Sequence, residues 1–309
     1  RFVTVALALI QATAMAVGFG KNGLLEEYNF VNAAVVVLTL TAGTAFLMWL
    51  GEQITGRGIG NGISMLIFAG IVSSFPTMIR TAWVGFFPKQ WWMLVFLVIY
   101  TLASIVFVIL INEGERRIPV QYAKRVVGRK MYGGQSSNIP IKVAMAGVIP
   151  IIFAMSIMSF PGTLAQLFGK PDGILVSITN FLTTGAIYPI LYFLLIVGFT
   201  YFYTSITFNP IEVSNNIKTN NGAIPGIRPG RPTTEYISKV LSRLTLIGAL
   251  CLGVIAVLPI VITMVMKTVD ISRLSLTGTS LLIVVGVALE TVREVESQML
   301  MRHYKGFLE

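Results

Sequence analysis

Few residues in this 309-residue sequence could perform catalysis or bind a metal ion. It contains one cysteine, Cys251, and one histidine, His303, whereas a structural zinc site takes four ligands of these types. The motifs of phosphate-binding loops, zinc proteases and serine hydrolases are absent from it. The glycines of 56–62 do not follow the G-x-G-x-x-G spacing, and they come after an apolar run rather than a strand. The sequence therefore predicts no enzyme and no cofactor, and a partner would have to supply any energy.

The chemistry that remains is positive charge, because Lys and Arg number 23 against 13 Asp and Glu. Seven of these basic residues lie in the segment 112–142. Polar and apolar residues alternate over 114–125, which is typical of an extended or hairpin-like protrusion. So many cations in one connection indicate an acidic partner, which could be nucleic acid, anionic lipid or an acidic protein surface.

A second polar segment, 209–243, holds one arginine in a stiff setting. Pro225 and Pro229 bracket Arg228, and two glycines beside them allow tight turns. A side chain held in this way loses little conformational entropy on binding. We therefore expect Arg228 to contact a partner.

Eight apolar runs accompany these two segments, and each is about long enough to cross the hydrocarbon core of a bilayer as a helix. Hydrophobic residues make up 55% of the sequence and charged residues 12%, which predicts an all-α polytopic membrane protein. The fifth and seventh runs contain Pro150 and Pro259, and a kink is expected at each. The runs are Phe2–Phe19, Phe30–Leu50, Gly62–Ile79, Trp91–Ile111, Val143–Phe160, Ile187–Phe208, Leu244–Met266 and Leu276–Val292.

The distribution of basic residues predicts the orientation of the chain. If both of its termini are cytoplasmic, 17 Lys and Arg lie inside and 6 lie outside, in agreement with the positive-inside rule. The two basic segments are then cytoplasmic loops, longer than most unstructured connections. They divide the chain into 1–111, 112–142, 143–208, 209–243 and 244–309.

The centres of the apolar runs carry no Asp, Glu, Lys or Arg, so no proton relay is expected within the membrane. Ile63 and Ile67 share one face of a helix, where packing against the core or lipid is the default interpretation. The residues alone leave open a secondary transporter for a small solute, which leaves the two basic loops unexplained. An intramembrane enzyme is disfavoured, because the catalytic motifs are absent.

Six stretches, in this order and at these spacings, resemble the bacterial SecY family, which forms the central subunit of the protein-conducting channel. They are 51–64 (GEQITGRGIGNGIS), 114–125 (GERRIPVQYAKR), 144–150 (AMAGVIP), 209–210 (NP), 224–230 (IPGIRPG) and 279–285 (TSLLIVV). The family has ten spans, and the eight runs are similar to the third to the tenth. The resemblance implies a SecY-type helical bundle, with two pseudo-symmetric halves around an hourglass pore. It also implies an upstream part with the first two spans.

In this family a ring of apolar side chains closes the waist of the pore. The resemblance assigns that role here to Ile63, Ile67, Ile152 and Ile283. It places the lateral gate between the first run and the fifth and sixth, with Gln11, Ile149 and Pro150 as candidate residues. It places docking residues in the two basic loops, and these are Arg116, Arg117, Tyr122, Lys124, Arg125 and Arg228.

The resemblance further implies the partners and the location of the protein. Members of the family sit in the bacterial cytoplasmic membrane, pass unfolded secretory chains across it, and release signal sequences and membrane segments into the lipid bilayer. The basic loops would bind the SecA motor ATPase or the ribosome, whose RNA phosphates suit arginine side chains. The small membrane subunits SecE and SecG would complete the channel.

Overall fold

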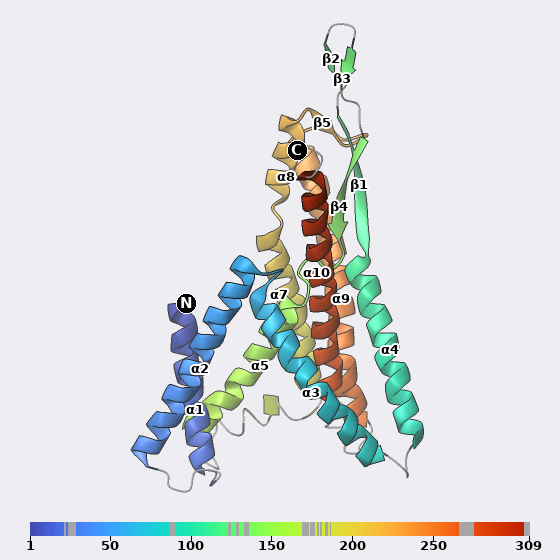
Figure 1. The fold of residues 1–309 in the computed structure, drawn as a ribbon. Helices are drawn as coiled ribbons and strands as arrows, with labels where there is room; N and C mark the ends of the chain where they lie inside the picture. The colour runs from blue at the N-terminus through green and yellow to red at the C-terminus, as the bar shows by residue number, and fades with distance from the viewer. Residues whose placement is uncertain are drawn as a thin grey trace.

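The structure is a computed structural model, and it describes residues 1–21, 23, 29–86, 91–122, 125–127, 130–132, 136–168, 173, 177, 179, 181–182, 185, 187–265 and 275–305. Long helices dominate these residues (Figure 1). The helices are α1 (Phe2–Lys21), α2 (Phe30–Arg57), α3 (Gly62–Phe86), α4 (Trp91–Glu113), α5 (Ile149–Phe168), α7 (Ile187–Thr207), α8 (Pro210–Thr219), α9 (Arg231–Val265) and α10 (Ser275–Lys305). The strands are β1 (Glu115–Tyr122), β2 (Arg125–Val127), β3 (Lys130–Tyr132), β4 (Ser136–Lys142) and β5 (Gly222–Ala223).

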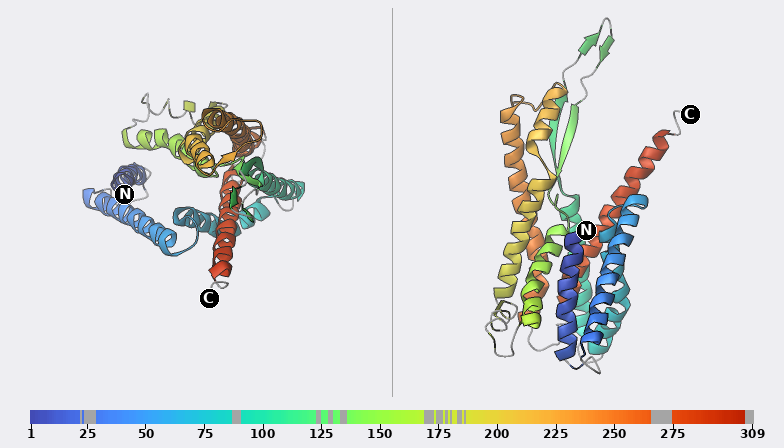
Figure 2. Two further views of the ribbon diagram at one scale, coloured as in Figure 1. Left: turned by 90° about the horizontal axis from the view of Figure 1, so that it is seen from above. Right: turned by 90° about the vertical axis from the view of Figure 1, so that its left-hand side faces the viewer.

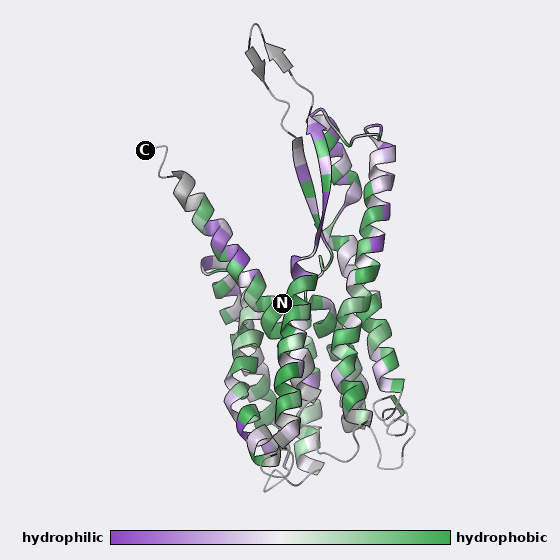
Figure 3. Ribbon diagram, turned by 90° about the vertical axis from the view of Figure 1, so that its right-hand side faces the viewer, coloured by the Kyte–Doolittle hydropathy of each residue, from purple (hydrophilic) through white to green (hydrophobic). Residues whose placement is uncertain are grey.

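The helices are apolar enough to form a membrane bundle, as hydropathy predicts. Among the described residues, six stretches could cross a membrane, and α5 adds a shorter apolar stretch, Ile149–Ala165. The six are Phe2–Gly20, Phe30–Arg57, Gly62–Thr81, Val95–Glu113, Ile187–Thr219 and Arg231–Ile262. Apolar residues follow the helices, whereas polar residues gather at the end from which the β1–β4 hairpin projects (Figure 3). We call this end of the bundle the sheet end.

Three later helices connect α1, α2 and α3 to the rest of the bundle. α1 packs against α2, and α2 packs against α3. α5 contacts both α1 and α7, α4 contacts α3, and α10 contacts α3, α4 and α9 (Figures 1 and 2). The N-terminal helices therefore join the later ones through α5 at α1 and through α4 and α10 at α3.

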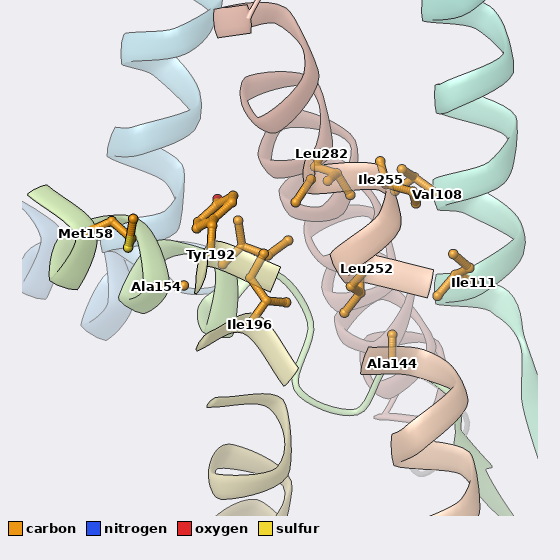
Figure 4. Packing of buried hydrophobic residues seen from close by; sticks show 12 residues of the cluster. Val108, Ile111, Ala144, Ala154, Met158, Tyr192, Ile196, Leu252, Ile255 and Leu282 are labelled. Carbon is orange, nitrogen blue, oxygen red and sulfur yellow. The ribbon is translucent and has the colours of Figure 1, made fainter. Parts of the chain in front are cut away.

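The main apolar core lies among the later helices (Figure 4). Tyr192 and Ile196 of α7 meet Ala154 of α5, and Leu252 of α9 lies in the same cluster with Leu282 of α10. Their side chains are almost completely buried. The outward faces of α4, α7 and α9 carry large exposed apolar side chains, which suits a surface in contact with lipid rather than water.

The fifth helix begins later than its apolar run predicts. Residues 143–148 form turns, in which Gly147 has a φ of +56°, and α5 begins at Ile149. Pro150 thus lies in the first turn of α5, where a missing backbone N–H leaves no hydrogen bond unmade. The predicted kink at Pro150 is therefore wrong. Pro161 is the proline inside α5, and Pro259 lies inside α9 as expected.

The turns of 143–148 pass close to α9. A Cβ atom on Gly248 of α9 would collide with the backbone oxygen of Val143. Val143 has little freedom to move, because its N–H donates to the oxygen of Gly114 at 2.8 Å. Glycine at 248 therefore sets how closely α9 approaches the root of the hairpin.

We predict that Gly248→Ala lowers the free energy of unfolding by about 1–3 kcal/mol, as overpacking does elsewhere. Gly198→Ala in α7 is the matched control, because a Cβ atom there meets nothing within 4 Å. Thermal unfolding of the purified variants in detergent measures the difference. Equal midpoints for the two variants would contradict the close approach at Gly248.

Candidate functional site

A tight connection between α2 and α3 positions the first candidate pore residues. A Cβ atom on Gly62 would collide with the carbonyl oxygen of Gly51, so the two helices meet backbone to backbone. The Thr55 hydroxyl joins the same two residues. It accepts from the Gly62 N–H at 2.9 Å and donates to the Gly51 oxygen at 2.9 Å. The glycines of this motif therefore serve close packing as well as the turn.

Asn61 starts α3 directly after this connection. Its side-chain oxygen accepts from the N–H groups of Ile63 and Ser64, at 3.0 and 3.4 Å. Asparagine is among the preferred residues for this capping position. The cap and the glycine contact together fix the direction in which α3 leaves the sheet end.

Three of the four predicted ring residues meet in one apolar cluster. Ile283 and Val287 of α10 are buried with Val148, and the half-buried Ile67 and Ile152 pack against them. These side chains come from α3, α5, α10 and the turn before α5. Met65, Phe68 and Ile71 of α3 complete the cluster, which we call the apolar constriction.

The fourth predicted ring residue, Ile63, lies outside the apolar constriction. Its side chain is 55% exposed. It lies near Gly51, because a Cβ atom on that glycine would stand 3.2 Å from Cγ1 of Ile63. Ile63 is one helical turn nearer the sheet end than Ile67.

Close packing on α10 brings the constriction together. A Cβ atom on Gly286 would stand 2.5 Å from Cγ1 of Val148, so a larger residue would push the turn away. One turn further along α10, the Thr291 hydroxyl donates to the sulfur of Met65 at 3.3 Å. α10 thus holds both α3 and the turn before α5.

The constriction contains only aliphatic, methionine and phenylalanine side chains. Such a lining offers an ion nothing to replace its hydration shell, and a narrow apolar passage excludes water by dewetting. The described residues hold no cluster of three or more His, Cys, Asp or Glu that could bind a metal ion. The apolar lining of the constriction suits a barrier to ions.

The candidate gate residues lie on two helices in contact. α1 packs against α5, and Pro150 is buried while Ile149 is half-buried at the start of α5. Gln11 is exposed on α1 and makes no side-chain hydrogen bond with the described residues. The α1 residues that are buried are small, namely Ala12, Ala14 and Ala16. A polar contact of Gln11 across the gate remains a prediction.

The two basic loops form one folded unit. β1 pairs antiparallel with β4, so that Ile118 lies opposite Ile139, and β5 of the second loop extends the same sheet beside β1. Alternate β1 side chains, Ile118 and Val120, face a buried core shared with α8 and α9. The other members of that core are Ile141, Ile217, Ile224, Ile237 and Leu241. The predicted hairpin is confirmed, and the second loop packs against it.

The segment 224–230 holds Arg228 at the surface, as its prolines and glycines predict. Gly226 and Gly230 have φ values of +82° and +105°. The Thr233 hydroxyl donates to the oxygen of Arg228 at 2.9 Å, and the Ser214 hydroxyl donates to that of Gly230 at 3.0 Å. Arg228 is exposed and makes no ion pair with the described residues, so its charge is available to a partner.

The remaining predicted docking residues differ in how the structure holds them. Arg116 is exposed on β1 without an ion pair to the described residues, whereas Arg117 pairs with Glu115 at 2.6 Å. Tyr122 is half-buried at the end of β1. Arg125 belongs to β2, whose side chains are not described, and Lys124 lies outside the described residues.

A charged contact joins α10 to the root of the hairpin. One guanidinium nitrogen of Arg293 lies 2.6 Å from the carboxylate of Glu113 and donates to the oxygen of Asn112 at 3.1 Å. A cavity of about 390 Å³ lies beside it, lined in part by Lys142 and Glu290. Sequence reasoning missed this contact because its partners are 180 residues apart.

Other residues of the site were also missed, although some left a signal. Val287 was missed, but it lies one helical turn after the predicted Ile283 on the same face of α10, so hydrophobic periodicity could have found it. Ser214 and Thr233 hold the segment around Arg228, and both are buried polar residues. Their partners are backbone oxygens, so no sequence pattern marks those contacts.

Comparisons with known proteins agree with this geometry. The sequence model of the SecY family matches residues 1–292. The protein translocase subunit SecY of Halalkalibacterium halodurans is 46% identical over 100% of this chain and 74% of its own length. The subunits of Bacillus subtilis and Mycobacterium bovis are 45% and 42% identical, again over 100% of this chain and 74% and 73% of their own lengths.

Solved structures show the same fold at lower identity. A structure described as that of a protein conducting channel has a TM-score of 0.63 and 19% identity, over 96% of this chain and 72% of its own. Another structure concerns the plug domain of the SecY protein. It has a TM-score of 0.62 and 20% identity, over 96% of this chain and 73% of its own. Matching in sequence from its first residue to Val292, and in fold over 96% of its length, the chain belongs to the SecY family.

Proposed function

We propose that this chain is the channel-forming subunit of a protein translocase, which passes unfolded secretory chains across a membrane. The observation that carries the proposal is the meeting of Ile67, Ile152 and Ile283 from three helices in one apolar constriction. Membership of the family of translocase subunits favours this function over a small-solute transporter. The chain would act as a conduit, and the energy would come from a partner.

The side chains of the apolar constriction would move apart around a translocating chain and pack together again afterwards. Branched aliphatic side chains pack against one another in the idle state and exclude water and ions. They contain no group that must keep a particular hydrogen bond, so they can part around a translocating chain of any sequence. A ring of polar side chains would bind water and leak ions when idle.

Release into lipid would require α1 and α5 to separate. The fully buried residues of α1 are alanines, and small side chains let helices approach closely. A hydrophobic signal sequence would enter between α1 and α5, which are in contact. We propose this seam as the lateral gate, with Gln11, Ile149 and Pro150 beside it.

The folded unit of the two basic loops would be the docking platform. Arg228 and Arg116 expose their charges on it without ion pairs to the described residues. We propose SecA and the ribosome as the partners that bind there. Among the structural relatives is Sec61 in a canine ribosome-channel complex, with a TM-score of 0.58 and 18% identity, over 96% of this chain and 72% of its own. SecE and SecG are proposed as the small subunits that complete the channel.

The location follows from the same reasoning. The apolar helices make this a multi-pass membrane protein. The bias of Lys and Arg toward the sheet end supports a cytoplasmic sheet end, with both termini of this chain on that side. We propose the bacterial cytoplasmic membrane as its location.

We predict that a photo-crosslinking residue at position 152 captures a secretory chain stalled in the channel. The full-length protein is used, with a ribosome-bound chain long enough to span the membrane. The crosslink should disappear when the signal sequence is deleted. The same probe at position 190, which is exposed on the outer face of α7, is the control and should capture no secretory chain.

The outcome at position 63 tests the extent of the ring. A crosslink from 152 and 67 but not from 63 would place Ile63 outside the ring. No crosslink from 152, 67 or 283, while SecA still binds the membranes, would contradict the assignment of the constriction as the pore.

We predict that Arg228→Glu lowers SecA-driven translocation at least tenfold while the protein still inserts normally. A carboxylate at this position repels an acidic partner, and the buried contacts that hold the backbone stay intact. ATP-dependent import of a precursor into inverted membrane vesicles measures the loss. Lys218→Glu, on the exposed end of α8, makes the same charge change away from Arg228 and should keep near-normal import. Normal import with Arg228→Glu would count against the docking role.

We predict that Gln11→Leu raises export of a precursor with a defective signal sequence several-fold. This result follows from the predicted polar contact of Gln11 across the gate, which the described residues do not show. Interhelical polar contacts in membranes contribute about 0.6 kcal/mol on average, so losing this one would ease opening of the gate. Thr39→Val is the control, because the Thr39 hydroxyl bonds only within α2, to the Val35 oxygen at 2.7 Å. Unchanged selectivity with Gln11→Leu would remove Gln11 from the gate.

A further inference from the structure

One face of α9 changes from apolar to basic along its length. Ile247, Leu250, Val254 and Leu258 are exposed at intervals of three or four residues, so they form one stripe along the helix. Lys239 and Arg243 continue the same stripe toward the sheet end, and both are exposed. The stripe therefore has an apolar part that faces lipid and a basic part directly beyond it.

The basic part of the stripe borders an open groove of about 650 Å³ between α9 and the beginning of α8. Three hydroxyl side chains of α9 line the groove together with Lys239 and Arg243. These are Thr234, Ser238 and Ser242. Across from them lie Asn209, Pro210 and Ile211 at the start of α8. Two cations beside several hydroxyl groups form a suitable setting for a phosphate diester.

The charges of the groove are not balanced within the protein. Glu235 is the acidic residue among those that line it, and its carboxylate pairs with Arg231 at 3.1 Å. Lys239 and Arg243 make no ion pair with the described residues. The two cations therefore lack a counter-charge from this part of the chain.

An aromatic residue marks the depth of the groove relative to the membrane. The hydroxyl of Tyr201 on α7 donates to the backbone oxygen of Ser242 at 3.2 Å. Tyrosine is enriched at the boundary between hydrocarbon and water, where its ring is apolar and its hydroxyl is hydrated. The neighbouring Phe202 and Ile206 are exposed, as is Ile211 at the edge of the groove. The groove thus lies at headgroup level.

We propose that this groove binds the headgroup of an anionic phospholipid, with Lys239 and Arg243 as the phosphate ligands. The acyl chains would lie along the apolar stripe of α9, beginning at Leu246 and Ile247. The bound lipid belongs to the leaflet at the sheet end. The site is separate from the apolar constriction and from the surface around Arg228.

The test counts lipids bound to the purified full-length protein in complex with its partner subunits. Native mass spectrometry follows a titration with phosphatidylglycerol, and a parallel titration uses phosphatidylcholine. We expect Lys239→Gln/Arg243→Gln to weaken binding of one phosphatidylglycerol about thirtyfold, since each basic residue near a membrane surface contributes about fivefold. Phosphatidylcholine binding should not change.

The matched control is Lys218→Gln/Arg228→Gln, which removes two charges from the sheet end but none from the groove. It should leave the affinity for phosphatidylglycerol unchanged. Equal binding by wild type and the groove variant would overturn the proposal. Equal loss of both lipids would also overturn it, because the groove would then hold acyl chains without recognising the headgroup.

A protein subunit is the alternative occupant, and accessibility distinguishes it. Ser238→Cys is introduced in a Cys251→Ser background and labelled with a membrane-impermeant maleimide. In the complete complex, protection that appears only when phosphatidylglycerol is present supports a lipid site. Protection that persists in lipid-free detergent would show that a partner subunit covers the groove, and would overturn the proposal.

Discussion

Close approach of one backbone to another at glycine is the constraint on which the rest of this structure depends. In lipid no hydrophobic force draws helices together, so their association relies on tight packing and on small residues that permit it. Two such contacts, and a third in which the glycine meets a side chain, lie at the positions that matter. Gly62 lies against the backbone of Gly51, Gly248 against the backbone of Val143, and Gly286 against the side chain of Val148. The first sets the direction of α3, the second places the root of the hairpin, and the third draws α10 onto the turn before α5.

The sheet end is stabilised by a different interaction, the burial of apolar side chains away from water. There the two basic loops lie outside the apolar bundle, and burial of Ile118, Val120 and Ile224 away from water provides the driving force. The core they form is shared by β1, β4, α8 and α9, and β5 adds backbone pairing to β1. The result is a stiff platform rather than two independent loops. The arginines that project from it therefore keep their positions relative to one another, which favours recognition of a partner with a fixed pattern of acceptors.

Hydropathy was enough to locate the membrane helices, because each needs a long apolar run whatever it packs against. It could not locate their ends. α9 begins at Arg231, well before its apolar run, since a helix continues into water where local pairs such as Arg231 with Glu235 support it. The prediction of a kink at Pro150 was wrong because the backbone turn at Gly147 delays the start of α5. Periodicity placed Ile63 and Ile67 on one face, yet only Ile67 lies in the apolar constriction. Pairing of β5 with β1 joins residues about a hundred positions apart, which no local pattern encodes.

α10 extends from the apolar constriction to the root of the hairpin as one uninterrupted helix. Its apolar part carries Ile283 into the constriction, and ten residues later Arg293 is bonded to Glu113 and Asn112 at the root of the hairpin. Ten residues of helix span about 15 Å. One continuous helix therefore joins the apolar constriction to the root of the hairpin, so a displacement of that root carried through Arg293 would also move Ile283.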